Sequence, residues 1–182
     1  MLFRLSSSAT KGINPSVWAP ILIGTLLFWL SSSLMLDLVV MPTLYVSGMM
    51  TEPGFAATGF TLFSVFNRVE LVCAGIICTG VLVATLASYP NQVKALFQYW
   101  NFNLTLAVGL LAIALMYTYG LTPEMGGLGI GLDALNPQTT VPAGMDMLHG
   151  SYWLIEMVKL AIGALLLRAI VRRVNAPTVG AE

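Results

Sequence analysis

The sequence predicts an all-α membrane protein, a four-helix transmembrane bundle made by one domain over residues 1–182. The chain is 57% apolar and only 9% charged, whereas a soluble domain carries about 25% charged residues. Its apolar residues gather in four runs, each long enough for the roughly 20 residues of helix that cross a bilayer. The formal net charge is zero, so nothing indicates a nucleic-acid partner, and the lipid bilayer is the expected environment.

The four predicted spans are joined by polar connections. The first span is longer than a bilayer requires, so we expect it to tilt or project, with Pro42 kinking or ending it near one surface. The connection over residues 122–147 is rich in Gly and Pro, and we expect a long loop there. The predicted spans cover residues 17–45, 60–86, 100–121 and 148–171.

The basic residues predict the orientation of these spans. Lys and Arg precede the first span, occur in the second connection and close the fourth span, whereas the first and third connections contain none. Cytoplasmic connections are enriched in Lys and Arg, so we expect a multi-pass integral membrane protein with both termini cytoplasmic. The basic residues behind this expectation are Arg4, Lys11, Lys94, Arg168, Arg172 and Arg173.

Polar residues inside the spans gather at one depth. His149, Glu156 and Lys159 enter the fourth span from its outer end, and His149 and Glu156 point within roughly 20° of each other on a helix. Glu156 lies roughly 12 Å below the start of its helix, and Asn67 and Glu70 lie at a similar depth in the second span. Ionisable groups in a span usually face the protein interior and have a role. These five residues are therefore the candidate ligand-binding site.

The charged residues allow more than one arrangement. Glu156 and Lys159 are three residues apart and can neutralise each other. Alternatively, Glu70 and Glu156 face each other across the bundle, where two close carboxylates can carry a proton or bind a cation. Arg68 points roughly 160° away from Glu70 around its helix. We expect Arg68 either to turn outward or to form a structural ion pair with Asp37 of the first span.

A second signal surrounds the only histidine of the chain. Met145 and Met147 precede His149, and thioether and imidazole ligands suit copper(I). A single histidine also permits one axial haem ligand. A Ser-His-Asp arrangement would need a nucleophile beside His149 and an acid that orients the histidine, and the sequence does not offer this combination. We therefore predict no catalytic residue and favour a binding protein over an enzyme.

Short motifs resemble a known superfamily. The first span ends in DLVVMPTLY (residues 37–45) after an upstream tryptophan, and the second contains FSVFNRVE (residues 63–70). With His149, Glu156 and Lys159, these stretches resemble the uncharacterised branch of the CopD-like superfamily of four-helix membrane proteins, which includes the copper-resistance CopD domain and the HemJ-type protoporphyrinogen oxidases. The resemblance implies copper handling or haem binding. HemJ-type proteins carry a histidine in their first helix, and the first span here has none.

Three hypotheses about function follow from these observations. The first is a multi-pass membrane protein that binds or moves a metal ion (copper) or haem at a polar site in the outward half of the membrane. The second is an interaction or assembly protein, a homo-oligomer or a partner in a membrane complex, whose polar residues fix the helix register. The third is a haem-linked redox enzyme. A metal or chromophore bound to the purified protein would distinguish the first from the second.

Cysteine labelling tests the predicted topology. We expect Gly131→Cys to react with a membrane-impermeant maleimide in intact cells, and Asn175→Cys to react only after permeabilisation. The reason is that six of the eight Lys and Arg residues fall on the predicted cytoplasmic side, as the distribution of positive charge in membrane proteins requires. Labelling of Asn175→Cys from outside would contradict the topology.

Overall fold

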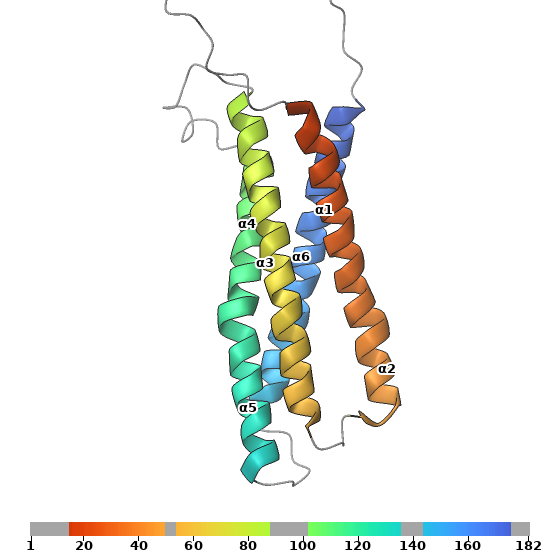
Figure 1. Ribbon diagram of the computed structural model, residues 1–182, viewed down its shortest axis with the longest axis vertical. Helices are drawn as coiled ribbons and strands as arrows, with labels where there is room; N and C mark the ends of the chain where they lie inside the picture. The colour runs from red at the N-terminus through yellow and green to blue at the C-terminus, as the bar shows by residue number, and fades with distance from the viewer. Residues whose placement is uncertain (1–14, 50–53, 88–101, 136–143, 176–182) are drawn as a thin grey trace, which may run out of the picture.

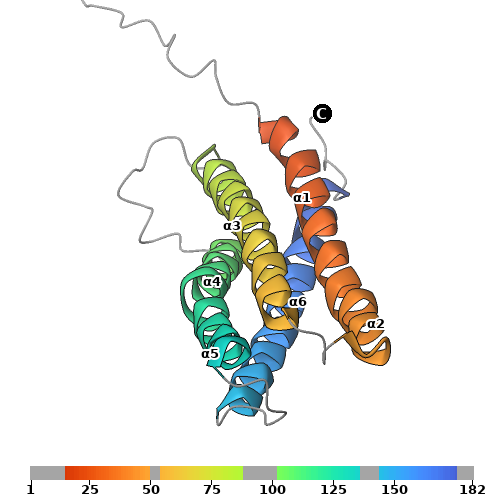
Figure 2. The same ribbon diagram turned by 60° about the horizontal axis from the view of Figure 1, so that its bottom comes forward.

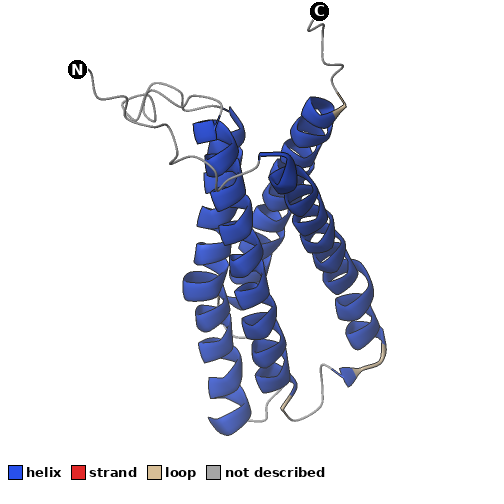
Figure 3. Ribbon diagram, turned by 45° about the horizontal axis from the view of Figure 1, so that its top comes forward, coloured by secondary structure: helices blue, strands red, loops and turns tan. Residues whose placement is uncertain are grey.

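The computed structural model describes residues 15–49, 54–87, 102–135 and 144–175, and the regular elements in these ranges are all helical (Figures 1 and 3). The elements form long rods, two of which contain a turn of π-helix. The first rod consists of α1 (Pro15–Met35), the π turn η1 (Leu36–Val40) and α2 (Met41–Val46). The others are α3 (Phe55–Ala87), the rod α4 (Phe102–Met116), η4 (Tyr117–Leu121) and α5 (Thr122–Leu135), and α6 (Met145–Val174).

The rods pack side by side in a closed order. α1 contacts α3 and α6, and α4 contacts α3 and α6, so the four helices surround a common interior (Figure 2). The C-terminal ends of α3 and α6 lie at the end of the molecule where α1 and α4 begin (Figure 1). We call this the basic end, because Arg172 and Arg173 close α6 there.

Three of the rods have the length and hydropathy of membrane spans. Val17–Val46, Phe55–Leu86 and Phe102–Gly129 are 28 to 32 residues long, and their mean hydropathy lies between 1.8 and 2.2. These helices fit an integral membrane protein. α6 is not among the three, since its apolar residues are interrupted by polar ones such as Glu156 and Lys159.

The expectation of a loop over residues 122–147 was wrong for its first half. Residues Thr122–Leu135 form the helix α5, which continues the rod of α4 and packs along α3. Glycine lowers helix propensity, but small residues also let two helices approach closely. At Gly126 a Cβ would lie 2.2 Å from Cδ2 of Phe60 in α3. Gly126, one of the glycines that suggested a loop, therefore serves the contact between α3 and α5.

Of the two expected effects of Pro42, a kink or an end of the first rod, the end is wrong. The rod is helical before and after Pro42, so the missing backbone N–H of this proline leaves one carbonyl of the preceding turn without its usual helical donor. The helix changes from α to π geometry just before Pro42, at the turn η1. Leu36 and Asp37 of this turn are buried.

The interior has an apolar half and a polar half. Leu26, Ala74, Ile77, Ala107 and Leu166 are fully buried and form the apolar core nearer the basic end. Buried polar and charged side chains fill the other half: Ser33, Asp37, Asn67, Glu70, Glu156 and Lys159. Helices α1 and α6 approach each other closely at Gly163. A Cβ at this position would lie 2.7 Å from Cδ2 of Leu30 in α1.

Two adjacent glycines of α5 provide a matched test of this packing. Gly126→Leu should lower the free energy of unfolding by about 1–3 kcal/mol, the usual cost of overpacking, because the ring of Phe60 fills the space. Gly127 is exposed, and a Cβ added there would meet no atom within 4 Å, so Gly127→Leu should change it by no more than about 0.5 kcal/mol. Unfolding in mixed detergent micelles measures both. Equal effects of the two changes would contradict the contact between α3 and α5.

Candidate functional site

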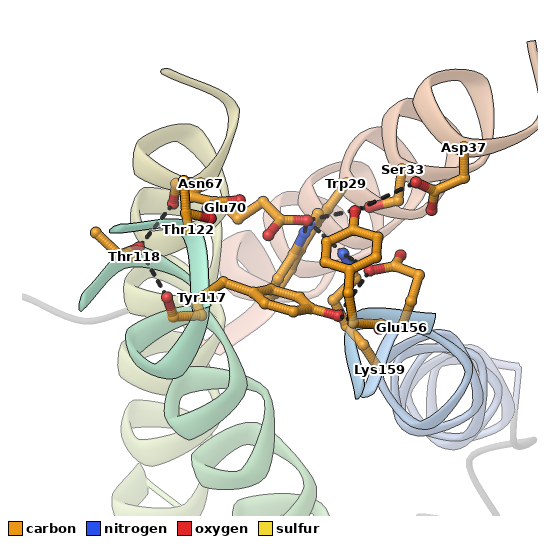
Figure 4. A network of polar contacts seen from close by, with 12 residues as sticks. Trp29, Ser33, Asp37, Asn67, Glu70, Tyr117, Thr118, Thr122, Glu156 and Lys159 are labelled. Atoms are coloured by element: carbon orange, nitrogen blue, oxygen red, sulfur yellow. Dashed lines mark hydrogen bonds and ion pairs between the residues drawn. The ribbon is translucent and has the colours of Figure 1, made fainter. Parts of the chain in front are cut away.

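Lys159 of α6 lies at the centre of the polar half of the interior (Figure 4). Its Nζ is 2.5 Å from Oε1 of Glu70 in α3 and 2.7 Å from Oε2 of Glu156, three residues earlier in α6. The three side chains are at most 2% exposed. One ammonium group therefore joins two carboxylates from different helices, with no water contact to weaken the attraction.

Glu70 receives two further hydrogen bonds from α1. The indole Nε1 of Trp29 donates to Oε1 at 2.8 Å, and the hydroxyl of Ser33 donates to the same oxygen at 3.2 Å. Counting the lysine, three donors converge on this oxygen, which suits an ionised carboxylate. Glu70 thus connects α1, α3 and α6 at one point.

Glu156 is held from the rod of α4. The hydroxyl of Tyr117, the first residue of η4, donates to Oε2 of Glu156 at 3.1 Å and lies 3.2 Å from the carbonyl oxygen of Tyr152. The ammonium of Lys159 lies 5.3 Å from the centre of the Tyr117 ring and 6.0 Å from that of Trp29. Aromatic faces at this distance attract a cation, so both rings help to hold Lys159 in place.

Asp37 extends the network to η1. The hydroxyl of Tyr152 donates to Oδ1 of Asp37 at 3.2 Å, and the carboxyl group of Glu156 is a neighbour of the carboxyl group of Asp37. Asp37 is 4% exposed and Glu156 is 0% exposed. One oxygen of each, Oδ2 of Asp37 and Oε1 of Glu156, is buried without a protein hydrogen-bond donor.

The structure brings together three of the five predicted ligand-binding residues: Glu70, Glu156 and Lys159. Asn67 is also buried, but it belongs to a neighbouring polar contact: its Nδ2 donates to Oγ1 of Thr122 at 2.6 Å. Of the two alternatives for the acidic residues, the pairing of Glu156 with Lys159 is formed, and Lys159 also contacts Glu70 across the interior. The other alternative, a proton or cation held between Glu70 and Glu156, stays a prediction.

His149 lies apart from the buried network. Its ring is exposed, and Nδ1 is 3.0 Å from the carbonyl oxygen of Met145 in its own helix. Met147 is 73% exposed. Among the described residues, no group of three or more His, Cys, Asp or Glu side chains is arranged to hold a metal ion. The metal site of His149, Met145 and Met147 relies on methionine sulfur and stays a prediction.

The expected ion pair between Asp37 and Arg68 is not formed. Arg68 is exposed on the outside of α3, whereas Asp37 is buried against Tyr152 and Glu156. Arg68 follows the other expected course and turns outward. The pair is not formed because Asp37 faces the interior of the bundle, whereas Arg68 faces its outside.

Sequence reasoning left Trp29 and Ser33 out of the candidate site and gave Asp37 another partner. Trp29, Ser33 and Asp37 recur every four residues along the first rod, and Tyr152 precedes Glu156 by four. Side chains at this spacing share a helix face, so a polar stripe in the first span was visible. Tyr117 had no such signal, because its position depends on the π turn η4.

Comparison with known proteins adds no relative: no protein-family model matches the chain, and no characterised protein or solved structure shows significant similarity. The chemistry of the site is therefore argued from its geometry. Three carboxyl groups and one ammonium group share a buried interior, and such an arrangement can hold a proton or exchange ion-pair partners.

Removing the central cation tests the network. Lys159→Met should lower the free energy of unfolding by about 3–5 kcal/mol, as loss of one partner from a buried ion pair does, because carboxylates are left without their counter-charge. Adding Glu70→Gln should recover part of the loss, since it removes one of the uncompensated charges. Unfolding in mixed micelles measures both variants.

The control is Arg168→Met, which removes a charge from an exposed position of the same helix and should change stability by no more than about 0.5 kcal/mol. If Lys159→Met were as mild as this control, the buried ion pairs would not exist.

Proposed function

We propose that this chain is a four-helix, multi-pass integral membrane protein that binds a proton inside the membrane at the paired carboxyl groups of Asp37 and Glu156. The main support is that Oδ2 of Asp37 and Oε1 of Glu156 are buried and accept no hydrogen bond from a protein donor. The fourth span is α6, and both termini lie on the cytoplasmic side. Membership of the uncharacterised CopD-like branch is part of the proposal and rests on the sequence motifs alone.

The balance of charge supports a bound proton. Asp37, Glu70 and Glu156 carry three carboxyl groups, and Lys159 is the one cationic side chain that contacts this group in the described part of the chain. Glu70 is matched by Lys159 and by two neutral donors. An unpaired ionised carboxylate in a dry interior is so costly that the group takes up a proton instead. One proton shared by Asp37 and Glu156 removes a charge and supplies the missing donor.

The depth of the network supports a site in the outward half of the membrane. Glu70 lies 17 residues before the end of α3 at Ala87, and Glu156 lies 17 residues before Arg173. Both are therefore about 26 Å along their helices from the basic end, close to the roughly 30 Å thickness of the hydrocarbon core. Along one side of α6, exposure falls from His149 through Tyr152 to Glu156, so protons would reach the pair from the outward end.

The proton proposal replaces the copper and haem hypotheses as the best-supported function. A copper or haem ligand at His149 would require partners from other elements, and the ring of His149 instead contacts its own helix. The assembly hypothesis makes a different prediction from ours: a purely structural network needs no exchangeable proton, whereas a proton-binding protein gains and loses one as conditions change.

Infrared spectroscopy of the purified chain in lipid tests for this proton. A protonated carboxyl group absorbs apart from an ionised carboxylate, and we expect one such band to persist at neutral pH. Asp37→Asn and Glu156→Gln should each abolish it, because the new amide removes one negative charge and its N–H supplies the donor that the proton supplied to the remaining carboxylate.

Glu124→Gln is the matched control, because Glu124 is an exposed carboxylate at the start of α5 and its loss should leave the band unchanged. Absence of the band in the wild-type chain would mean that all buried acids are ionised, and the proposal would fail in favour of the assembly role. A band that survives both substitutions would place the proton elsewhere.

A further inference from the structure

Arg68 lies on a groove that the buried network does not use. The groove has a volume of about 500 Å³ and lies between α3 and the π turn η4. One side of it is a single face of α3, formed by Phe60, Ser64, Arg68 and Leu71. These residues are four, four and three positions apart, which keeps them on one side of the helix.

The opposite side of the groove comes from the rod of α4. Thr118 and Tyr119 of η4 and Pro123 of α5 line it, and the Tyr119 side chain is 72% exposed. The groove thus combines one cationic group and several hydroxyl-bearing side chains with apolar walls. Such a mixture suits a ligand that has both a polar head and an apolar body.

The surroundings of Arg68 on α3 are apolar and exposed. Val65 is 58% exposed, Val69 is 40% exposed and Val72 is 62% exposed, as expected of a helix surface that contacts lipid. Among the described residues, no carboxylate lies within ion-pair distance of Arg68. A guanidinium group among lipid-facing residues needs an anion or water at the membrane surface.

The position of Arg68 along α3 places it in the outward leaflet. It precedes Ala87 by 19 residues, which is about 28 Å of helix, against a hydrocarbon core roughly 30 Å thick. This step rests on the arrangement of spans proposed above, but not on proton binding. With the basic end at the cytoplasmic surface, the long side chain of Arg68 reaches toward the phosphate layer of the outward leaflet.

We propose that the groove beside Arg68 is a binding site for an anionic phospholipid, whose phosphate contacts the Arg68 guanidinium and whose acyl chain follows Leu71 and Val72. The planar guanidinium fork matches the geometry of a phosphate group. The apolar walls of Phe60 and Leu71 favour a lipid over free phosphate, because a hydrated ion would lose water there without compensation.

Native mass spectrometry of the full chain in mild detergent, with phosphatidylglycerol added, tests the proposal. We expect a one-to-one lipid adduct, and Arg68→Gln should weaken it about tenfold, equivalent to the loss of one charge-assisted hydrogen bond. Phosphatidylcholine should bind more weakly than phosphatidylglycerol. Ser64→Leu, which fills the groove and keeps the charge, should also weaken the adduct, and it decides the matter if Arg68→Gln does not fold.

The matched control is Arg168→Gln, which removes an exposed arginine from α6 near the basic end and should leave the adduct intact. Equal binding by the wild type and both groove variants would overturn the proposal, as would an equal loss in Arg168→Gln, because lipid would then follow total charge alone. Displacement of the lipid by inorganic phosphate at the same concentration would also overturn it, since the site would then recognise the free anion.

Discussion

The ammonium group of Lys159, held between Glu70 and Glu156, is the interaction on which the rest of the structure depends. A lysine with so little exposure is stable in an apolar interior only if its charge is matched and its donors are satisfied. This requirement brings α3 and α6 to a fixed distance, and Trp29 and Ser33 bring α1 to the same carboxylate. The apolar core nearer the basic end supplies packing, while the ion pairs specify which faces of the helices meet.

The two π turns supply the groups that the ion pairs alone would lack. η1 places Asp37 in the interior, and η4 places Tyr117 where its hydroxyl reaches Glu156. A π turn inserts an extra residue into a helix and is frequent at functional sites. The same turn, η4, also lines the groove beside Arg68. The rod of α4 therefore contributes to the interior site and to the outer surface of the molecule from adjacent residues.

Some of this arrangement could be predicted from the sequence, and the reasons for the rest are physical. Glu70, Glu156 and Lys159 were recognisable because a charge in an apolar run must find a partner. The partner of Asp37 was not, because helical spacing indicates which face a residue lies on but not which neighbouring helix that face meets. His149 lies outside this network, since a residue in the second turn of its helix has access to water and its ring contacts the carbonyl oxygen of Met145 one turn earlier. The helix α5 was missed because contact with α3 outweighs the low helix propensity of its glycines.

The pairing of Lys159 is tested most directly by solid-state nuclear magnetic resonance of the chain in lipid bilayers, with ¹⁵N at the lysine amines and ¹³C at the side-chain carboxyl groups. Of the three lysines in the sequence, Lys159 is the one inside a predicted span. Our account predicts that its amine nitrogen correlates with two carboxyl carbons, and that Glu70→Gln and Glu156→Gln each remove one of the two signals. A single correlation, or none, would contradict it.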